Sequence, residues 1–248
     1  VRNLVQGTAA VEAGELDTEV PVITQDEIGK LTGSFNTMVA GLRLKERIQN
    51  TFGKYMDPRI VSNLLDNPEF AEPGGEKREM TVLFIDLKGF TSISEKLAPN
   101  DLVNMVNDFF SLMGEAIASN NGVVDKYMGD AVMAYWGPPF TGKDEHAELA
   151  CKAALEALKQ LVTFRSDVKK QLGAEADDLE IDLRIGVSTG EMIVGTIGSK
   201  ASMNFTVMGD PVNLGSRLEG ASKAYGTRIL ISERTHELAG DSIVSREI

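Results

Sequence analysis

The stretch that most constrains the fold of this chain runs from residue 80 to residue 137. Its first part, residues 82–85, is a continuous apolar run with β-branched members, which is typical of a strand buried on both faces. Asp86 ends this run, and residues 88–91 predict a turn into a helix. A carboxylate beside a buried strand is costly to place, so we expect Asp86 to have a specific role.

The second part of the stretch predicts two strands, residues 123–127 and residues 131–136, joined by a tight turn. Residues 128–130 form the turn, in which Gly129 supplies a position with positive φ. Asp130 ends the turn and precedes the second strand. The stretch therefore carries one carboxylate in each of its two parts, both at strand ends.

Two carboxylates at neighbouring strand ends are open to two interpretations. An aspartate at a strand end is commonly a helix cap or a turn former, and each residue taken alone fits that role. A pair of carboxylates beside a turn rich in backbone N–H groups also suits a divalent cation with phosphate. The order of the two motifs, separated by one helix and one strand, favours the site for metal and phosphate.

Length, charge and cysteine content narrow the class of protein. The 248 residues suffice for one sizeable domain and a smaller attachment, and a hydrophobic content of 42% is ordinary for a globular protein. The net charge of −12 argues against nucleic-acid binding, which needs a basic surface. The single cysteine, Cys151, has no partner in the chain for a disulfide. No apolar run approaches the length that spans a membrane.

The first 44 residues read as a separate helical unit. A first helix ends near Gly14, an extended connector follows, and Asp26 begins a second helix. Apolar residues recur along the second helix at alternating spacings of four and three, which is the seam of a coiled coil: Leu31, Phe35, Met38 and Leu42. A generic amphipathic hairpin is the alternative interpretation.

The remainder of the chain alternates helices and strands. Residues 45–76 predict a helical segment followed by a linker, because prolines and glycines gather in residues 67–75. Long helices are predicted over residues 100–119 and 144–171.

The C-terminal part adds further strands. Residues 181–187 predict a strand, which Gly190 turns into a second strand over residues 192–197. Pro211 is placed to open a helix. Hairpins mixed with crossover helices indicate an α+β layer with helices on one side of the sheet.

Residues 77–248 resemble the catalytic domain of class III nucleotidyl cyclases, because both aspartate motifs and the later helix with Asn213 and Arg217 agree in order and spacing. The resemblance implies an α+β fold with a ferredoxin-like, palm-type sheet and flanking helices. Residues 1–44, with the motifs G-E-L-D, D-E-I-G and F-N-x-M, resemble a HAMP domain, the all-α coiled-coil signal relay of membrane receptors. Residues 45–76 would then be the helical coupling segment and linker.

The cyclase resemblance implies that ATP is closed to 3′,5′-cyclic AMP with release of pyrophosphate. Two Mg²⁺ or Mn²⁺ ions per site would be held by Asp86, Asp130 and the main-chain carbonyl of Ile85. Backbone N–H groups at the start of the following helix would bind phosphate oxygens. These belong to Gly89, Phe90 and Thr91.

Four further residues match the family's catalytic and base-reading positions. Asn213 and Arg217 stand four apart on one helix and share a face; in the family the Asn orients the ribose and the Arg stabilises phosphoryl charge. Lys126 and Thr206 match the positions that select the base. An ammonium suits the N1 acceptor of adenine, and a hydroxyl can accept from the 6-amino group. Guanylate cyclases carry Glu at the Lys126 position, so adenine is favoured and a guanylate cyclase is the alternative.

The resemblance also implies partners and a location. Relatives are homodimers in which the metal carboxylates come from one subunit and the base-reading and Asn/Arg groups from the other. We therefore expect a homodimer through the coiled coil and the catalytic domain. The parent protein would be membrane-anchored upstream, with this part soluble on the cytoplasmic side. The chain starts at Val1 and ends before the C-terminal strands that bring the family's phosphate-binding lysine, so we expect a fragment whose full activity is in doubt.

Three other functions compete with this interpretation. A catalytically weak regulatory domain that only binds nucleotide is disfavoured by the intact aspartate, Asn and Arg motifs. A diguanylate cyclase would need a G-G-[DE]-E-F turn, and residues 128–132 are not one. A signalling relay alone would explain residues 1–44 and leave residues 77–248 without a role.

Overall fold

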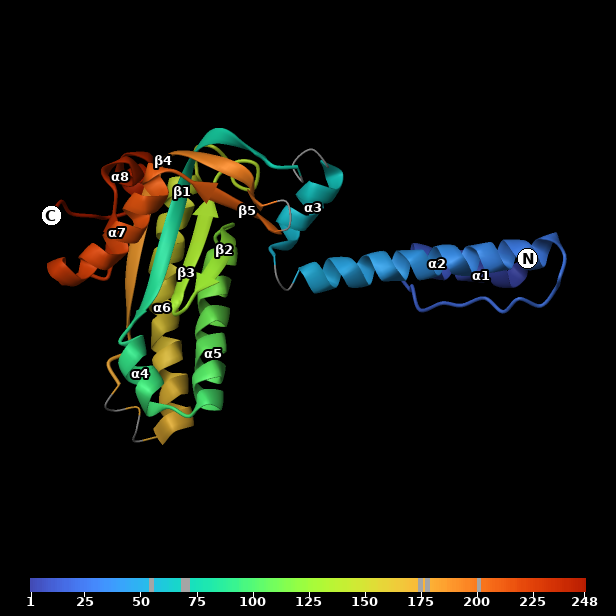
Figure 1. Cartoon of the computed structure of the whole chain (residues 1–248), viewed down its shortest axis with the longest axis horizontal. Helices are drawn as coiled ribbons and strands as arrows, with labels where there is room; N and C mark the ends of the chain where they lie inside the picture. Colours follow the sequence, from blue (N-terminus) through green and yellow to red (C-terminus); the bar gives the residue numbers. More distant parts are fainter. Residues whose placement is uncertain (54–55, 68–71, 174–175, 177–178, 200–201) are drawn as a thin grey trace. The chain divides into compact units, whose positions relative to one another are not determined.

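The computed structural model describes residues 1–53, 56–67, 72–173, 176, 179–199 and 202–248. It divides into two compact units, Val1–Ser62 and Asn63–Ile248 (Figure 1). Among the described residues, no helix combines the length and the apolar character needed to cross a membrane.

The first unit contains α1 (Arg2–Glu12) and α2 (Glu27–Phe52), and α3 (Pro58–Asp66) begins in it. Gly14, just beyond α1, has φ +88°, a conformation that glycine adopts without strain. Asp26 caps α2, because its Oδ1 accepts hydrogen bonds from the backbone N–H groups of Ile28 at 3.0 Å and Gly29 at 3.1 Å. The predicted end of the first helix and start of the second are thus confirmed.

A small core joins the helices of the first unit to the connector between them. Val20 of the connector packs with Phe35 and Val39 of α2. The Asn36 side chain holds the connector, accepting from the Val20 N–H at 3.0 Å and donating to the Val20 carbonyl at 2.8 Å. The other members of the predicted seam are exposed, at 56%, 52% and 39% of their surface: Leu31, Met38 and Leu42. Of the four seam residues, Phe35 therefore packs inside the first unit, and the other three face outward from it.

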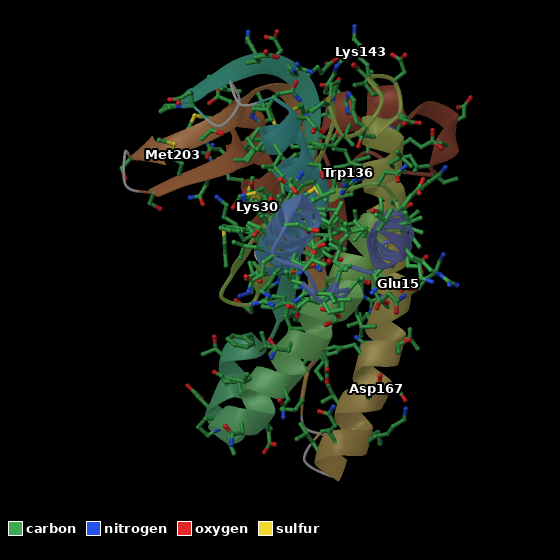
Figure 2. The ribbon with its side chains drawn as sticks, turned by 90° about the vertical axis from the view of Figure 1, so that its right-hand side faces the viewer. Glu15, Lys30, Trp136, Lys143, Asp167 and Met203 are labelled. Carbon is green, nitrogen blue, oxygen red and sulfur yellow. The ribbon has the colours of Figure 1, made fainter. Side chains whose placement is uncertain are left out.

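In the described part of the second unit, six strands form one sheet. They are β1 (Gly74–Lys88), β2 (Val123–Met128), β3 (Ala131–Trp136), β4 (Asp182–Ser199), β5 (Ser202–Met208) and β6 (Ile229–Ile231). The order is β2-β3-β1-β4-β5, all antiparallel, and β6 pairs with β4 in parallel. Met203 lies near the tip of the β4–β5 hairpin (Figure 2).

Helices cover both faces of this sheet. They are α4 (Phe90–Lys96), α5 (Pro99–Ala118), α6 (His146–Leu172), α7 (Asp210–Tyr225) and α8 (Glu233–Ala239). Leu83 and Ile85 of β1 belong to a core with Phe109 of α5 and with α6, which lies beside α5 (Figure 1). The intervening residue Phe84 points to the other face, where it meets Gly215 of α7. The α+β class is confirmed, whereas the prediction of helices on one side only was wrong.

Two predicted boundaries also differ from the structure. β1 already begins at Gly74, inside the predicted linker, and of that linker residues 68–71 lie outside the described residues. β4 runs without a break through Gly190, where a turn was predicted. Gly190 pairs with Met80, and a Cβ on it would lie 2.6 Å from the Pro211 ring. The glycine is needed because the start of α7 approaches the strand closely, not because the chain turns.

The packing of α7 on the sheet depends on another close approach, at Gly186 of β4. A Cβ on Gly186 would lie 2.1 Å from the Gly215 carbonyl oxygen and 2.4 Å from the Glu219 nitrogen, both backbone atoms of α7. Gly186→Ala must therefore push α7 away, and we expect it to reduce the free energy of unfolding by about 1–3 kcal/mol in denaturant titrations. Gly220→Ala is the matched control, because a Cβ there meets open space. The control should stabilise α7 by about 0.5–1 kcal/mol, and equal stability of the two variants would contradict the packing described here.

Candidate active site

The structure brings the two predicted aspartates together at one end of the sheet. Asp86, near the end of β1, pairs with Ala131, the residue after Asp130. The Asp130 carbonyl accepts a hydrogen bond from the Leu87 N–H at 3.4 Å. Gly129, with φ +65°, makes the two-residue turn that places Asp130 there. The β2–β3 turn thus docks beside the end of β1 and sets Asp130 next to Asp86.

Two further charged side chains complete this group, which we call the acidic cluster: Asp86, Asp130, Glu219 and Arg184. Burial raises the pKa of Asp86, the nearby Asp130 raises it further, and Arg184 opposes the rise. The Arg184 guanidinium lies 3.6 Å from the Asp86 carboxylate. Burial, Asp86 and Asp130 raise the pKa of Glu219 to about 7, again against Arg184. Carboxylates therefore outnumber cations in a partly buried place, which favours the arrival of positive charge.

Sequence reasoning missed Arg184 and Glu219. Arg184 is a charged residue inside a strand of alternating apolar residues, and it pairs with Asp86 across β1 and β4. Glu219 stands four residues after Gly215, on the side of α7 that meets the sheet. The charge within the strand was the available signal for Arg184.

The residues of the acidic cluster fit a divalent metal that is bound together with phosphate. Within the described ranges, no three His, Cys, Asp or Glu side chains form a group that could hold a metal by themselves. Mg²⁺ commonly uses only one or two carboxylates and takes its other ligands from water and substrate phosphates. The side chain of Ile85 is buried, so this residue could contribute only its main-chain carbonyl. The mutual repulsion of Asp86 and Asp130 is what a divalent cation would relieve.

The three predicted phosphate-binding residues lie at the start of α4, directly after β1. Gly89 precedes the helix with φ +88°, and no side chain caps the helix. A Cβ on Gly89 would lie 2.6 Å from the Glu180 carbonyl oxygen, so only glycine fits there. Phe90 and Thr91 form the first turn, whose backbone N–H groups have no partner within the helix.

Lys126 of β2 and Thr206 of β5 both lie beside Asp125, although their strands stand at opposite ends of the sheet order. Sequence reasoning missed Asp125. Lys126 Nζ lies 3.1 Å from Asp125 Oδ2, and the Asp125 side chain is 1% exposed. Burial raises the pKa of Asp125, and interactions with the Thr206 hydroxyl and the Lys126 ammonium oppose the rise. Phe205, next to Thr206, packs edge-on against Phe140 at 5.9 Å, which helps to hold β5 over this part of the sheet.

Asn213 and Arg217 are exposed on α7. Gly215 and Glu219 mark the side of the helix that meets the sheet, and the helical repeat puts Asn213 and Arg217 on the opposite side. In the described part of the chain, no hydrogen bond or ion pair joins Arg217 to the acidic cluster. Within one chain, α7 therefore separates the acidic cluster from the Asn213–Arg217 pair.

This fold, with two carboxylates beside a glycine-led helix, defines a nucleotidyl cyclase catalytic domain, and comparison with known families agrees. Residues 74–246 match the adenylate and guanylate cyclase catalytic domain, and residues 1–44 match the HAMP domain. The chain belongs to the adenylate and guanylate cyclase family, as the sequence analysis predicted.

Two curated relatives of this chain are adenylate cyclases. An adenylate cyclase of Anabaena cylindrica is 33% identical over 94% of this chain and 46% of its own length. Adenylate cyclase 1 of Rhizobium meliloti is 34% identical over 88% of this chain and 31% of its own length. The chain thus spans less than half the length of these curated relatives.

Solved structures similar to this chain include both kinds of cyclase. The adenylyl cyclase CyaB from P. aeruginosa is 32% identical with a TM-score of 0.61, covering 66% of this chain and 82% of that one. The guanylyl cyclase Cya2 is 35% identical with a TM-score of 0.60, covering 68% of this chain and 81% of that one. Since identity to the two is nearly equal, overall similarity does not choose between ATP and GTP.

Proposed function

We propose that this chain is the catalytic part of an adenylate cyclase that converts ATP to 3′,5′-cyclic AMP and pyrophosphate. The observation that carries the proposal is the acidic cluster, in which the β2–β3 turn holds Asp130 against Asp86 at the end of β1. Membership in the cyclase family indicates the class of reaction, and the acidic cluster provides a site for that reaction.

Different groups around the acidic cluster would have different roles in phosphoryl transfer. Two bound Mg²⁺ or Mn²⁺ ions would supply acidification of the ribose 3′-hydroxyl and neutralisation of the triphosphate. Asp86, Asp130 and the Ile85 carbonyl would hold them. Arg184, which lies beside Asp86, would add positive charge near a bound triphosphate. The N-terminal turn of α4 would bind phosphate oxygens through backbone N–H groups.

Asn213 and Arg217 would act in the site of a second subunit. Asn213 would orient the ribose and Arg217 would stabilise the charge that develops on the α-phosphoryl group. Both face away from the acidic cluster of their own chain, which supports a homodimer with two shared sites. The exposed Leu31, Met38 and Leu42 of α2 support pairing of the N-terminal units in a coiled coil.

Lys126 and Thr206 would read the base. Both lie beside the Asp125 side chain within one chain, which supports recognition of a single purine edge. The ammonium can donate to N1 of adenine and the hydroxyl can accept from the 6-amino group, whereas guanine presents a donor at N1. The alternative, a guanylate cyclase, draws on the 35% identity to Cya2.

Residues 1–44 would relay a signal to the catalytic unit through the coupling segment of residues 45–76. The HAMP match supports the relay, and the continuous course of α2 from Glu27 to Phe52 carries it past the end of that match. The parent protein would be anchored in a membrane upstream, with the catalytic unit on the cytoplasmic side.

The test of this function is product formation by the purified chain. With Mn²⁺ and either ATP or GTP as substrate, we expect cyclic AMP to form and cyclic GMP to form at least about tenfold more slowly, quantified by chromatography. Absence of any cyclic product would overturn the enzymatic proposal. Faster formation of cyclic GMP would overturn the assignment of the base.

A further inference from the structure

A β-bulge places Asp125 beside Lys126. Val124 of β2 pairs with Ala134 of β3. Lys126 pairs with the next residue, Met133, so Asp125 is an extra residue without a partner in the ladder. Neighbouring side chains in a regular strand point to opposite faces. The bulge removes this alternation and lets the ammonium of Lys126 reach the carboxylate of Asp125 at 3.1 Å.

The Asp125 carboxylate is enclosed, whereas the groups beside it reach the surface. Its side chain is 1% exposed and both oxygens are buried, while 42% of the Lys126 side chain is exposed. The Thr206 hydroxyl lies against the same carboxylate. Among the described residues, neither carboxylate oxygen makes a hydrogen bond of full geometry, so this buried group depends on the two polar neighbours beside it. Asp125 is thus built to interact with Lys126 and Thr206 rather than with solvent or nucleotide.

The chemistry of this trio sets the direction of any hydrogen bond between Thr206 and Asp125. An ionised carboxylate only accepts hydrogen bonds, and the adjacent Lys126 ammonium favours the ionised form. A hydroxyl has one proton, so in a hydrogen bond to this carboxylate Thr206 donates that proton. The lone pairs of Thr206 then remain for a ligand, and they can accept from the 6-amino group of adenine but cannot donate to the 6-oxo group of guanine.

We propose that Asp125 is a specificity-determining positioning residue that fixes Thr206 as an acceptor and holds Lys126 beside it, so that a 6-amino purine is selected. This inference rests on the proposed function for the base-reading role of Lys126 and Thr206. It adds that the choice of base depends on a carboxylate that does not touch the nucleotide.

The test exchanges the acceptor for a group that can also donate. The amide of Asp125→Asn is nearly the same size and can turn its NH₂ toward Thr206, which frees the hydroxyl proton for the 6-oxo group of guanine. Binding is measured with 3′-deoxy-ATP and 3′-deoxy-GTP in the presence of Mn²⁺, because neither nucleotide can be cyclised. The affinity ratio of the adenine to the guanine nucleotide should fall about tenfold relative to the unchanged protein.

Controls separate this role from a purely structural one. Asp101→Asn removes an exposed carboxylate from α5 and should leave the ratio unchanged. In a Thr206→Val background, Asp125→Asn should not change the ratio further, because the hydroxyl is absent. Asp125→Ser, whose smaller hydroxyl can also donate, repeats the test if the asparagine variant melts early. A structural role would weaken both nucleotides equally, and that result, or an unchanged ratio, would overturn the inference. Failure of the unchanged protein to cyclise ATP would instead overturn the proposed function.

Discussion

Replacement of Asp86 by alanine, or of Asp130 by alanine, should abolish cyclic AMP formation while leaving the fold intact. Each change removes a carboxylate that would hold the metal ions, and the loss of preorganised charge stabilisation of this kind typically costs about 10²–10³ in rate or more. Stability should not suffer. Burial and the neighbouring Asp130 both raise the pKa of Asp86, so the carboxylate is a source of repulsion in the metal-free protein.

Initial rates at saturating Mn²⁺, together with melting temperatures, check this result. Asp101→Ala serves as the control, since it removes an exposed carboxylate remote in sequence from both motifs and should keep the full rate. Asp86→Asn keeps the size of the side chain and should be as inactive as Asp86→Ala. Either aspartate variant that retained most of its rate would show that metal is bound elsewhere.

Mixing Asp86→Ala protein with Arg217→Ala protein should restore activity that neither variant has alone. Arg217 projects from the side of α7 opposite to the acidic cluster, so each active site would combine the cluster of one subunit with the Arg217 of the other. A mixed dimer then contains one site with both lesions and one site with none. Random pairing makes about half of the dimers mixed, so the activity per total protein should approach about a quarter of the unmutated value.

The control for this experiment is a mixture of two variants with lesions on the same side, Asp86→Ala and Asp130→Ala. No intact site can form in that mixture, and it should stay inactive. Exchange of subunits is verified by pulling down one tagged variant and detecting the other. If subunits exchange and the first mixture still stays inactive, the active site lies within a single subunit.

The pairing of Asp86 with Asp130 could be anticipated because it depends on local patterns. A buried apolar run fixes the first strand, and a glycine turn fixes the hairpin that carries the second aspartate. Gly190 was misread because a glycine that admits a neighbouring helix looks, in sequence, like a glycine that turns the chain. Glu219 belongs to a surface helix in the sequence pattern and enters the cluster only through the packing of α7.

The residues proposed to select the base show the same limit of prediction from sequence. The matched positions of Lys126 and Thr206 came from a family resemblance, and their roles remain predictions. Asp125 gave no signal, because its burial depends on a bulge against β3 and on the approach of β5 from the other end of the sheet order. A local sequence pattern predicts neither a register shift nor a contact between distant strands.

The glycine contact between β4 and α7 has a consequence for communication between active sites. Because residue 186 is glycine, the α7 backbone contacts the β4 backbone directly. No flexible side chain at this point can absorb a displacement of α7 relative to the strand. In a dimer with shared sites, the inner side of α7 would touch one nucleotide pocket through Glu219 and the outer side would touch the other through Arg217. Each α7 would then connect the two pockets mechanically. A nucleotide that tilts α7 in one pocket would also displace Arg217 in the second pocket.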